Sequence, residues 1–217
     1  MGGGPSLKLI DPSYLRNEAT FAVNSIFLIT DWLGFLPTYY MVEDRLVVED
    51  RCKDIENFHG PVKFYDQRYN TKIAPDANTF NINMVDDYSD YAGFPEFSRR
   101  ADKGVWCGGT VTYLCIQMAF YMGFDPVYLV GIDHNYVRPS HVESAGTVWT
   151  SQGDDPNHFH PDYFGRGKKW HDPRVDRMER AYESARTVFR RADRRILNAT
   201  IGGKLEVFPR VPFNELF

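Results

Sequence analysis

Several features that define large functional classes are missing from this sequence of 217 residues. No run of about 18 apolar residues occurs, so no transmembrane helix is predicted. The N-terminus also lacks the basic and apolar regions of a signal peptide. The net charge of -4 provides no basic surplus for a general nucleic-acid binder. We therefore predict a cytoplasmic protein with no nucleic-acid partner, and association with a membrane surface stays compatible with the sequence.

Cysteine is also scarce, and its spacing excludes two kinds of cross-link. Cys52, Cys107 and Cys115 form no CxxC pair and leave an odd thiol, which argues against a disulfide framework or a zinc knuckle. No low-complexity tract is present, and the 43% hydrophobic content is that of an ordinary globular protein, so disorder is not expected. The length predicts a single domain over residues 1–217.

Segments of strand and helix character alternate along the chain. The pattern predicts strands at 20–28, 37–42, 62–65, 79–84 and 127–132, helices at 7–15, 45–57, 108–123 and 173–193, and a strand, turn and strand over 196–208. Such alternation indicates an α/β fold with a Rossmann-like, mostly parallel sheet flanked by helices. Residues 134–172 show no regular period and carry five of the six histidines, so we predict an irregular lid or active-site loop there.

Two glycine clusters each lead into a predicted helix: Gly2-Gly3-Gly4-Pro5-Ser6 and Gly108-Gly109-Thr110. Glycine lets the backbone approach a ligand, and a helix N-terminus offers free N–H groups to an anion. Neither cluster is a Walker or GxGxxG motif, and a purely structural turn is the alternative for each. Together they predict the phosphate site of a nucleotide. The strand that the first turn would follow is missing, which indicates an N-terminally truncated fragment or, alternatively, a cloning scar.

Carboxylates follow two of the predicted strands. Asp44 comes two residues after the segment 37–42, and Asp133 follows the strand 127–132, at the edge where open parallel sheets bind ligands. With His134 and Asn135 beside it, Asp133 is a candidate for binding ribose hydroxyls or Mg²⁺. A capping aspartate is the structural alternative.

The His158-Phe159-His160 stretch provides the candidate base. A neutral imidazole can take a proton from a hydroxyl nucleophile, and we assign this role to His158. Zinc chelation by the HxH pair and a plain loop histidine are the alternatives. No third ligand stands at an established spacing, so no metal site is predicted.

A family resemblance joins these pieces. The chain resembles the bacterial MptE-like and motility-associated-factor domains in six segments: GGGPSL (2–7), FAVNSIF (21–27), PTYYMVED (37–44), GGTVTYLCIQMAFYMGF (108–124), VYLVGIDHNY (127–136) and NHFHPDYFG (157–165). The closing NATIGGKLEVFPRVPFNELF (198–217) is similar too.

That family is more distantly similar to the sialyltransferases of glycosyltransferase family 42, which transfer sialic acid from its cytidine monophosphate donor. The resemblance implies a Rossmann-like fold with a lid, His158 as the base and Asn24 as a donor-binding residue. It also makes Tyr136 the counterpart of a phosphate-binding tyrosine. Gly3 stands where the sialyltransferase turn has a donor-contacting asparagine, and Thr110-Val111 replaces a threonine-serine pair.

We therefore predict a sialyltransferase-like glycosyltransferase. It would move a sugar, such as a nonulosonic acid, from a nucleotide donor, CMP-linked by resemblance, to the hydroxyl of a glycan or other acceptor. Backbone amides of Gly2 to Ser6 and of Thr110 would stabilise the departing phosphate. The predicted substrate-binding residues are Gly2, Gly3, Gly4, Pro5, Ser6, Asn24, Asp44, Gly108, Gly109, Thr110, Asp133, His134, Asn135, Tyr136, His160 and Tyr163.

Two alternatives stay open. The glycosyltransferase hypothesis requires no cofactor. The archaeal pterin enzymes of the family transfer diphosphate from ATP to 6-hydroxymethyl-dihydropterin with magnesium, which Asp133 and Asp44 would hold in this chain. The second alternative is a nucleotide-sugar-binding protein without catalysis.

Overall fold

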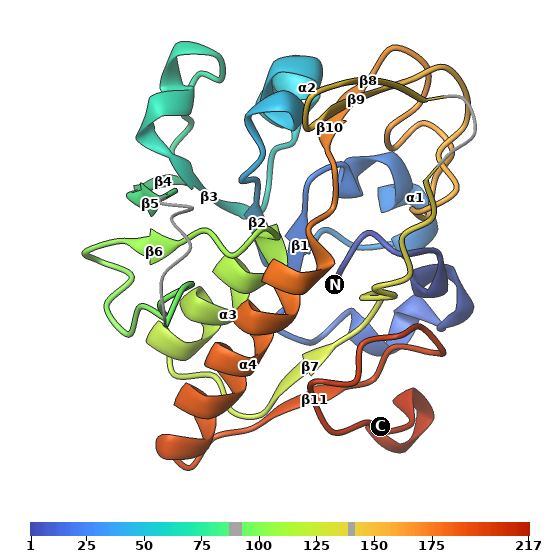
Figure 1. The fold of residues 1–217 in the computed structure, drawn as a ribbon. Coiled ribbons are helices and arrows are strands. Elements are labelled where there is room, and N and C mark those ends of the chain that lie inside the picture. The colour runs from blue at the N-terminus through green and yellow to red at the C-terminus, as the bar shows by residue number, and fades with distance from the viewer. Residues whose placement is uncertain (87–92, 139–141) are drawn as a thin grey trace.

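The computed structural model describes residues 1–86, 93–138 and 142–217, and within them it contains a mixed α/β fold (Figure 1). A parallel sheet of four strands has the order β1 (Phe21–Val23), β2 (Tyr39–Met41), β3 (Val62–Asp66) and β4 (Thr79–Ile82). Two further parallel pairs join β5 (Met84–Val85) with β6 (Val105–Trp106), and β7 (Val127–Leu129) with β11 (Ile196–Asn198). The predicted Rossmann-like class is confirmed.

The helices flank these sheets. They are α1 (Thr30–Leu33), α2 (Arg45–Asn57), α3 (Val111–Tyr121) and α4 (Val175–Arg191), with short 3-10 turns at Pro5–Leu9, Pro12–Leu15, Ile26–Ile29, Gln67–Thr71 and Phe213–Glu215. Figure 1 shows α3 and α4 side by side. The buried residues of α4 recur at helical spacing: Met178, Ala181, Tyr182, Ala185 and Phe189. None of the helices in the described ranges is long and apolar enough to cross a membrane.

Residues 1–4 connect the four-stranded sheet with the β7–β11 pair. The N-terminal nitrogen of Met1 donates a hydrogen bond to Phe21 O in β1, at 2.7 Å. On the other side, Gly2 N donates to Val130 O and Gly4 N to Gly131 O, each at 2.8 Å, just past the end of β7. The first glycine turn is therefore fixed between the two sheets, where the pocket described below opens.

The prediction of a helix at 7–15 is wrong, because the segment forms two 3-10 turns, Pro5–Leu9 and Pro12–Leu15, with Asp11 between them. Several predicted strands are also shorter than expected, and two of them end for visible reasons. The segment 20–28 ends as a strand at Val23, because Asn24 adopts a positive φ of 48° and a 3-10 turn follows from Ile26. The segment 196–208 keeps only β11 as a strand. Beyond it the chain turns at Gly202 and Gly203, both at positive φ, and Asn198 Nδ2 donates to Leu205 O across the loop in place of a strand ladder.

The prediction that residues 134–172 are irregular is wrong in part. This region contains an antiparallel sheet of the order β10 (Lys169–His171), β9 (Val148–Ser151) and β8 (Val142–Ala145). Trp149 and Trp170 face each other across β9 and β10, with their rings edge to face at 5.9 Å. The β8–β9 hairpin turns at Gly146 and Thr147, a local signal that the pattern overlooked, whereas β10 pairs with β9 across the loop 152–168 and leaves no period in the sequence.

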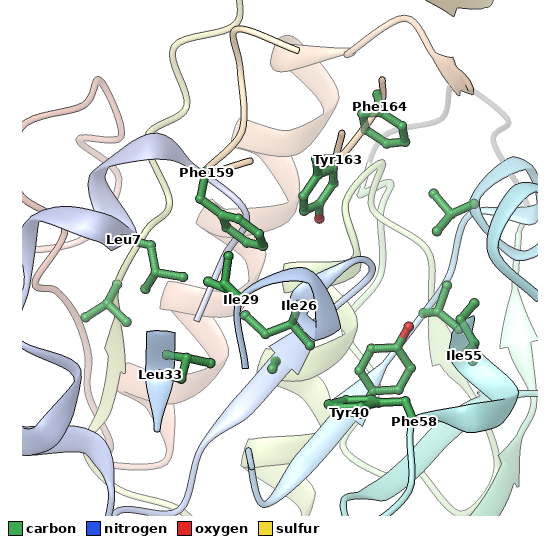
Figure 2. Close-up of a cluster of buried hydrophobic side chains, with 14 of the residues drawn as sticks. Leu7, Ile26, Ile29, Leu33, Tyr40, Ile55, Phe58, Phe159, Tyr163 and Phe164 are labelled. Carbon is green, nitrogen blue, oxygen red and sulfur yellow. The ribbon is translucent and has the colours of Figure 1, made fainter. Parts of the chain in front are cut away.

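The loop between β9 and β10 is packed into the largest hydrophobic core. Phe159, Tyr163 and Phe164 from this loop join core residues that include Leu7, Ile26, Leu33 and Ile55 (Figure 2). Burying an aromatic side chain of this size stabilises its position by about 2 kcal/mol. The loop is thus part of the core packing, and any side chain carried between these aromatic residues has a defined place.

Candidate functional site

A pocket lies where the first glycine turn, the end of β7 and the start of α3 meet. Ten of the predicted site residues line it: Gly3, Gly4, Asn24, Thr110, Asp133, His134, Asn135, Tyr136, His158 and Tyr163. Val23, Val111, Thr112, Gly131, Ile132, Asn157 and Tyr182 complete the lining. The other predicted residues stand outside it: Gly2, Pro5, Ser6, Asp44, Gly108, Gly109 and His160. The fold thus gathers residues that are more than 150 positions apart in the chain.

His158 and Asp155 form a dyad on one side of this pocket. His158 Nδ1 lies 2.7 Å from Asp155 Oδ2, and the Asp155 side chain is 2% exposed. The carboxylate is held in turn by two backbone donors, Asn157 N at 2.8 Å and Phe164 N at 3.1 Å. A buried carboxylate on Nδ1 fixes the orientation of an imidazole and leaves Nε2 for a reacting proton. The arrangement is that of an oriented general base.

The first glycine turn positions this dyad. Phe159 N, next to His158, donates to Gly3 O at 2.8 Å. The His158 ring stacks on Tyr163 at 4.0 Å between centroids and 7° between planes. A Cβ on Gly3 would lie 2.8 Å from both His158 Cδ2 and Tyr163 Oη. Only a residue without a side chain allows the two rings to approach the turn this closely.

Most amides of the Gly2 to Ser6 turn, which were predicted to hold a phosphate, already have hydrogen-bond partners within the protein. Gly2 N and Gly4 N donate to backbone carbonyls, Ser6 N donates to Asp133 Oδ2 at 3.1 Å, and Pro5 has no N–H. The Asp133 carboxylate also fills the space beside Gly4, where a Cβ would lie 1.6 Å from Oδ2. These donors are already used, and the nearest charge is negative.

Asp133 itself is supported by the loop after β11. Lys204 N donates to Asp133 O at 2.7 Å, and Ile132 N donates to Thr200 Oγ1 at 3.1 Å. Gly203 stands at φ 73°, and a Cβ there would lie 2.7 Å from Asp133 O. The segment 198–205, which resembles the family but received no predicted role, therefore holds the Asp133 backbone in place.

The second glycine turn is built differently. Gly109 stands at φ 81°, and the Thr110 side chain caps α3 by accepting from Thr112 N at 3.3 Å. Tyr182 of α4 contacts the side chains of both threonines. Burial raises the pKa of Tyr182 to about 12, so its phenol stays protonated and can donate. Here a helix N-terminus and hydroxyl groups face the pocket.

His134 is the second histidine of the pocket. Its side chain is 2% exposed, and its backbone has a positive φ of 51°. The imidazole lies against the rings of Tyr136 and Tyr182, with 6.0 Å between ring centroids in each pair. Glu179 Oε1 lies 3.4 Å from Nε2, and neither ring nitrogen makes a hydrogen bond. Burial lowers the pKa of His134, with Glu179 opposing the shift, so the ring is neutral near neutral pH.

The magnesium pair of the diphosphokinase hypothesis is not formed. Asp44 caps α2 by accepting from Leu46 N at 2.8 Å, and its other oxygen lies 3.1 Å from His171 Nδ1 in β10. It does not line the pocket that contains Asp133. Across the described ranges, no group of three or more His, Cys, Asp and Glu side chains is placed to hold a metal ion. His160 also lies outside the pocket, where its Nδ1 accepts from Asp162 N at 3.1 Å.

Sequence reasoning missed several residues of this site, among them Asp155, Thr112 and Tyr182. Asp155 received no role, although its spacing of three residues before His158 was a usable signal. Tyr182 could not be found, because a tyrosine on the buried face of a long amphipathic helix has the same sequence pattern as a core residue.

The fold and the pocket define an α/β protein with a pocket at the ends of parallel strands, next to an oriented histidine. The sequence model of the family described as "6-hydroxymethylpterin diphosphokinase MptE-like" matches residues 1–139, and the chain belongs to this MptE-like family. The family expected from the motifs is therefore confirmed, and the family's description is that of a transferase. No curated protein and no solved structure matched the chain.

Proposed function

We propose that this protein is a glycosyltransferase that moves a sugar from a nucleotide-activated donor to an acceptor hydroxyl. The observation that carries the proposal is the His158–Asp155 dyad, with Nδ1 and Oδ2 2.7 Å apart and His158 on the pocket wall. A structural histidine needs no buried carboxylate aligned on it and no access to a pocket. The protein has both, which supports a base that takes a proton from a bound hydroxyl.

The proposed step is a direct displacement. The acceptor oxygen forms a bond to the anomeric carbon of the donor, while the bond from that carbon to the phosphate oxygen breaks. The proton of the acceptor hydroxyl passes to His158 Nε2, and the electron pair of the broken bond leaves with the nucleotide phosphate. Asp155 stabilises the imidazolium that forms. Asn24 and Asn135, which both line the pocket, would orient the donor.

The nucleotide has to be identified before turnover can be measured. Thermal unfolding is followed with CMP, CDP, UDP, GDP and ATP, each with and without Mg²⁺. The proposal expects a rise in the melting temperature with a cytidine nucleotide in the absence of metal. The corresponding sugar nucleotide then serves as the donor with a panel of hydroxyl acceptors.

Replacing the base tests the proposal. We expect His158→Ala to lower turnover by roughly 10²- to 10⁴-fold, while nucleotide binding is kept. His59→Ala serves as the matched control, because His59 is an exposed histidine beside Asp76 that does not line the pocket. Unchanged turnover in His158→Ala would refute the assignment. Tight nucleotide binding without turnover across all donors and acceptors would indicate a binding protein.

The second candidate is diphosphate transfer from ATP to a pterin-type hydroxyl, which the family's description favours. The acceptor oxygen would then attack the β-phosphorus, AMP would leave, and His158 would take the same proton. Asp44 caps α2 and contacts His171, so it is not paired with Asp133 around a magnesium ion. ATP stabilisation that requires Mg²⁺ in the thermal screen would select this reaction over sugar transfer.

A further inference from the structure

We propose that Thr110, Thr112, His134 and Tyr182, here called the α3 wall, form the subsite that binds the phosphate of the nucleotide. This inference rests on the proposed function only for the kind of ligand, a nucleotide. The phosphate would bind at the second glycine turn and not at the first. Tyr182 thereby gains a binding role that the sequence did not indicate.

Helix α3 points its N-terminus at the pocket. Its N-terminus begins at Val111, and Thr110, Val111 and Thr112 all line the pocket. An α-helix of this length carries a partial positive charge at its N-terminal end, together with backbone N–H groups that lack partners within the helix. The pocket therefore receives the end of α3 that attracts anions.

Side-chain donors also surround this helix end. Tyr182 contacts the hydroxyl-bearing side chains of Thr110 and Thr112, so three O–H groups gather at one place. All three residues line the pocket. Phosphate oxygens accept several hydrogen bonds at once, and a cluster of hydroxyl donors at a helix N-terminus matches this demand.

A buried histidine gives an observation that is independent of the helix. His134 is 98% buried at its side chain and lines the same pocket, and its Nδ1 has no partner, whereas its Nε2 lies 3.4 Å from Glu179 Oε1. A buried polar group without a partner costs about 1 to 3 kcal/mol, and such a cost is commonly retained where a ligand supplies the partner. The Glu179 carboxylate is half-exposed, so solvent screens its charge.

The first glycine turn provides the contrast. There the amides of Gly2, Gly4 and Ser6 are already hydrogen-bonded, and Asp133 places a carboxylate against the turn. An anion would meet a negative charge and few free donors at this turn. Within one pocket, the α3 wall is therefore the favourable place for a phosphate. The leaving phosphate and the His158–Asp155 dyad then belong to different walls, as a displacement with a separate base and leaving group requires.

The test compares two isosteric variants of pocket tyrosines. Tyr182→Phe removes one hydroxyl from the α3 wall, and Tyr163→Phe removes one hydroxyl beside His158. Isothermal titration calorimetry measures the affinities for CMP, cytidine, AMP, adenosine and inorganic phosphate. We expect the wild-type protein to bind CMP or AMP more tightly than the matching nucleoside. Tyr182→Phe should weaken the nucleotide by about 5- to 10-fold and leave the nucleoside unchanged.

The control keeps the proposal falsifiable. Tyr163→Phe should leave the ratio of nucleotide to nucleoside affinity unchanged within about 2-fold, because its hydroxyl is not on the α3 wall. His134→Gln should reduce the ratio in the same direction as Tyr182→Phe, and it provides a second variant if Tyr182→Phe does not fold. Thermal unfolding of each variant checks that the fold is kept.

Three results would overturn the proposal: no preference for the nucleotide in the wild-type protein, equal ratios in the wild-type protein and in Tyr182→Phe, or an equal loss in Tyr163→Phe. Free sialic acid, which carries a carboxylate and no phosphate, is titrated in parallel. Binding of this acid that depends on Tyr182, with no effect on nucleotides, would assign the wall to a sugar carboxylate instead. None of these measurements requires turnover. If the protein shows no transferase activity but Tyr182→Phe still weakens nucleotide binding, the proposed function is refuted and the subsite is kept.

Discussion

The two glycine turns of this protein have similar sequences and different physical roles. In the first, Gly2 to Ser6, the glycines are needed for space: Gly4 has an ordinary φ of -68°, yet a Cβ there would strike Asp133. In the second, Gly108 is also needed for space, because a Cβ there would lie 2.6 Å from Ala181 Cβ. Gly109, however, is needed for conformation: its φ is 81°, and a Cβ would meet Arg177 Cδ at an ordinary 3.4 Å. The first turn uses its N–H groups inside the protein, whereas the second leads into a helix whose N-terminus faces the pocket.

This difference shows that a glycine-rich turn before a helix is not sufficient evidence for a phosphate site. The decisive question is whether the backbone donors of the turn already have partners. In the first turn they do, and its contribution to function is to seat the loop that carries His158. In the second, Thr112 N is used by the Thr110 cap, but no carboxylate lies among the described atoms nearest to its two glycines, and the hydroxyl-bearing residues Thr110, Thr112 and Tyr182 line the pocket.

The largest effect should come from Gly4→Ala. The new Cβ would lie 1.6 Å from Asp133 Oδ2, so the turn or the Asp133 loop has to move. Overpacking of this kind should lower the free energy of unfolding by about 3 kcal/mol. Urea denaturation followed by circular dichroism measures it. A loss below about 1 kcal/mol would show that the first turn is not packed as described.

Gly3→Ala should affect activity more than binding. Its Cβ would lie 2.8 Å from His158 Cδ2 and from Tyr163 Oη, which displaces the base. A displacement of about 1 Å at a reacting group can lower turnover by about 100-fold. Steady-state kinetics and nucleotide titration separate the two effects. If Gly3→Ala strongly weakens nucleotide binding but keeps the turnover at saturating donor, the first turn is the phosphate site and the comparison is reversed.

Gly109→Ala should be milder than Gly4→Ala. Here the cost is that of placing an L-residue at φ 81°, about 1 kcal/mol in the free energy of unfolding, because the space around the glycine is sufficient. The same urea denaturation applies. A cost for Gly109→Ala equal to or above that of Gly4→Ala would contradict the distinction between a glycine needed for space and one needed for conformation.

The smallest effect concerns the contact between Asp44, which caps α2, and His171 in β10. This contact is separate from both glycine turns. The hydrogen bond with Asp44 raises the pKa of His171. A raised folded-state pKa gives stability that is complete below the unfolded value of about 6.5 and is lost as the pH rises through the folded value. His171 is half-exposed, so we expect the contribution to stay below about 1 kcal/mol.

The measurement is the difference in unfolding free energy between wild type and His171→Gln at pH 5.5 and at pH 8.5. The wild-type protein should be the more stable of the two at the lower pH, and the difference should shrink at the higher pH. A difference that grows with pH would mean that the Asp44–His171 contact does not stabilise the charged ring.

Local patterns predicted the parts of the fold that depend on neighbouring residues. Helix α2 spans the predicted 45–57, and α4 lies within the predicted 173–193, because capping and amphipathic spacing are local signals. The β8–β9 hairpin, which turns at Gly146 and Thr147, is local and was overlooked. The pairing of β10 with β9 and the early end of β1 at Asn24 depend on contacts between segments that are separated along the chain. A single sequence carries no local signal for such contacts.

The prediction of the candidate site was likewise correct where the signal was local and incomplete where it depended on distant contacts. Types of residue that bear chemistry, such as His158 and Asp133, were recognisable, and the fold brings both to one pocket. Whether the amides of Gly2, Gly4 and Ser6 were free could not be predicted, because their partners, Val130, Gly131 and Asp133, come from a strand end more than 100 residues away.

The most direct test of the account is the turnover of Asp155→Asn, measured with the donor that the nucleotide screen identifies. Asparagine keeps the shape of the side chain and removes the charge that orients His158 and stabilises its protonated form. The account predicts a fall in turnover of roughly 10²- to 10⁴-fold, with nucleotide affinity unchanged within about 2-fold. Turnover equal to that of the wild-type protein would contradict the assignment of His158 and Asp155 as the catalytic dyad.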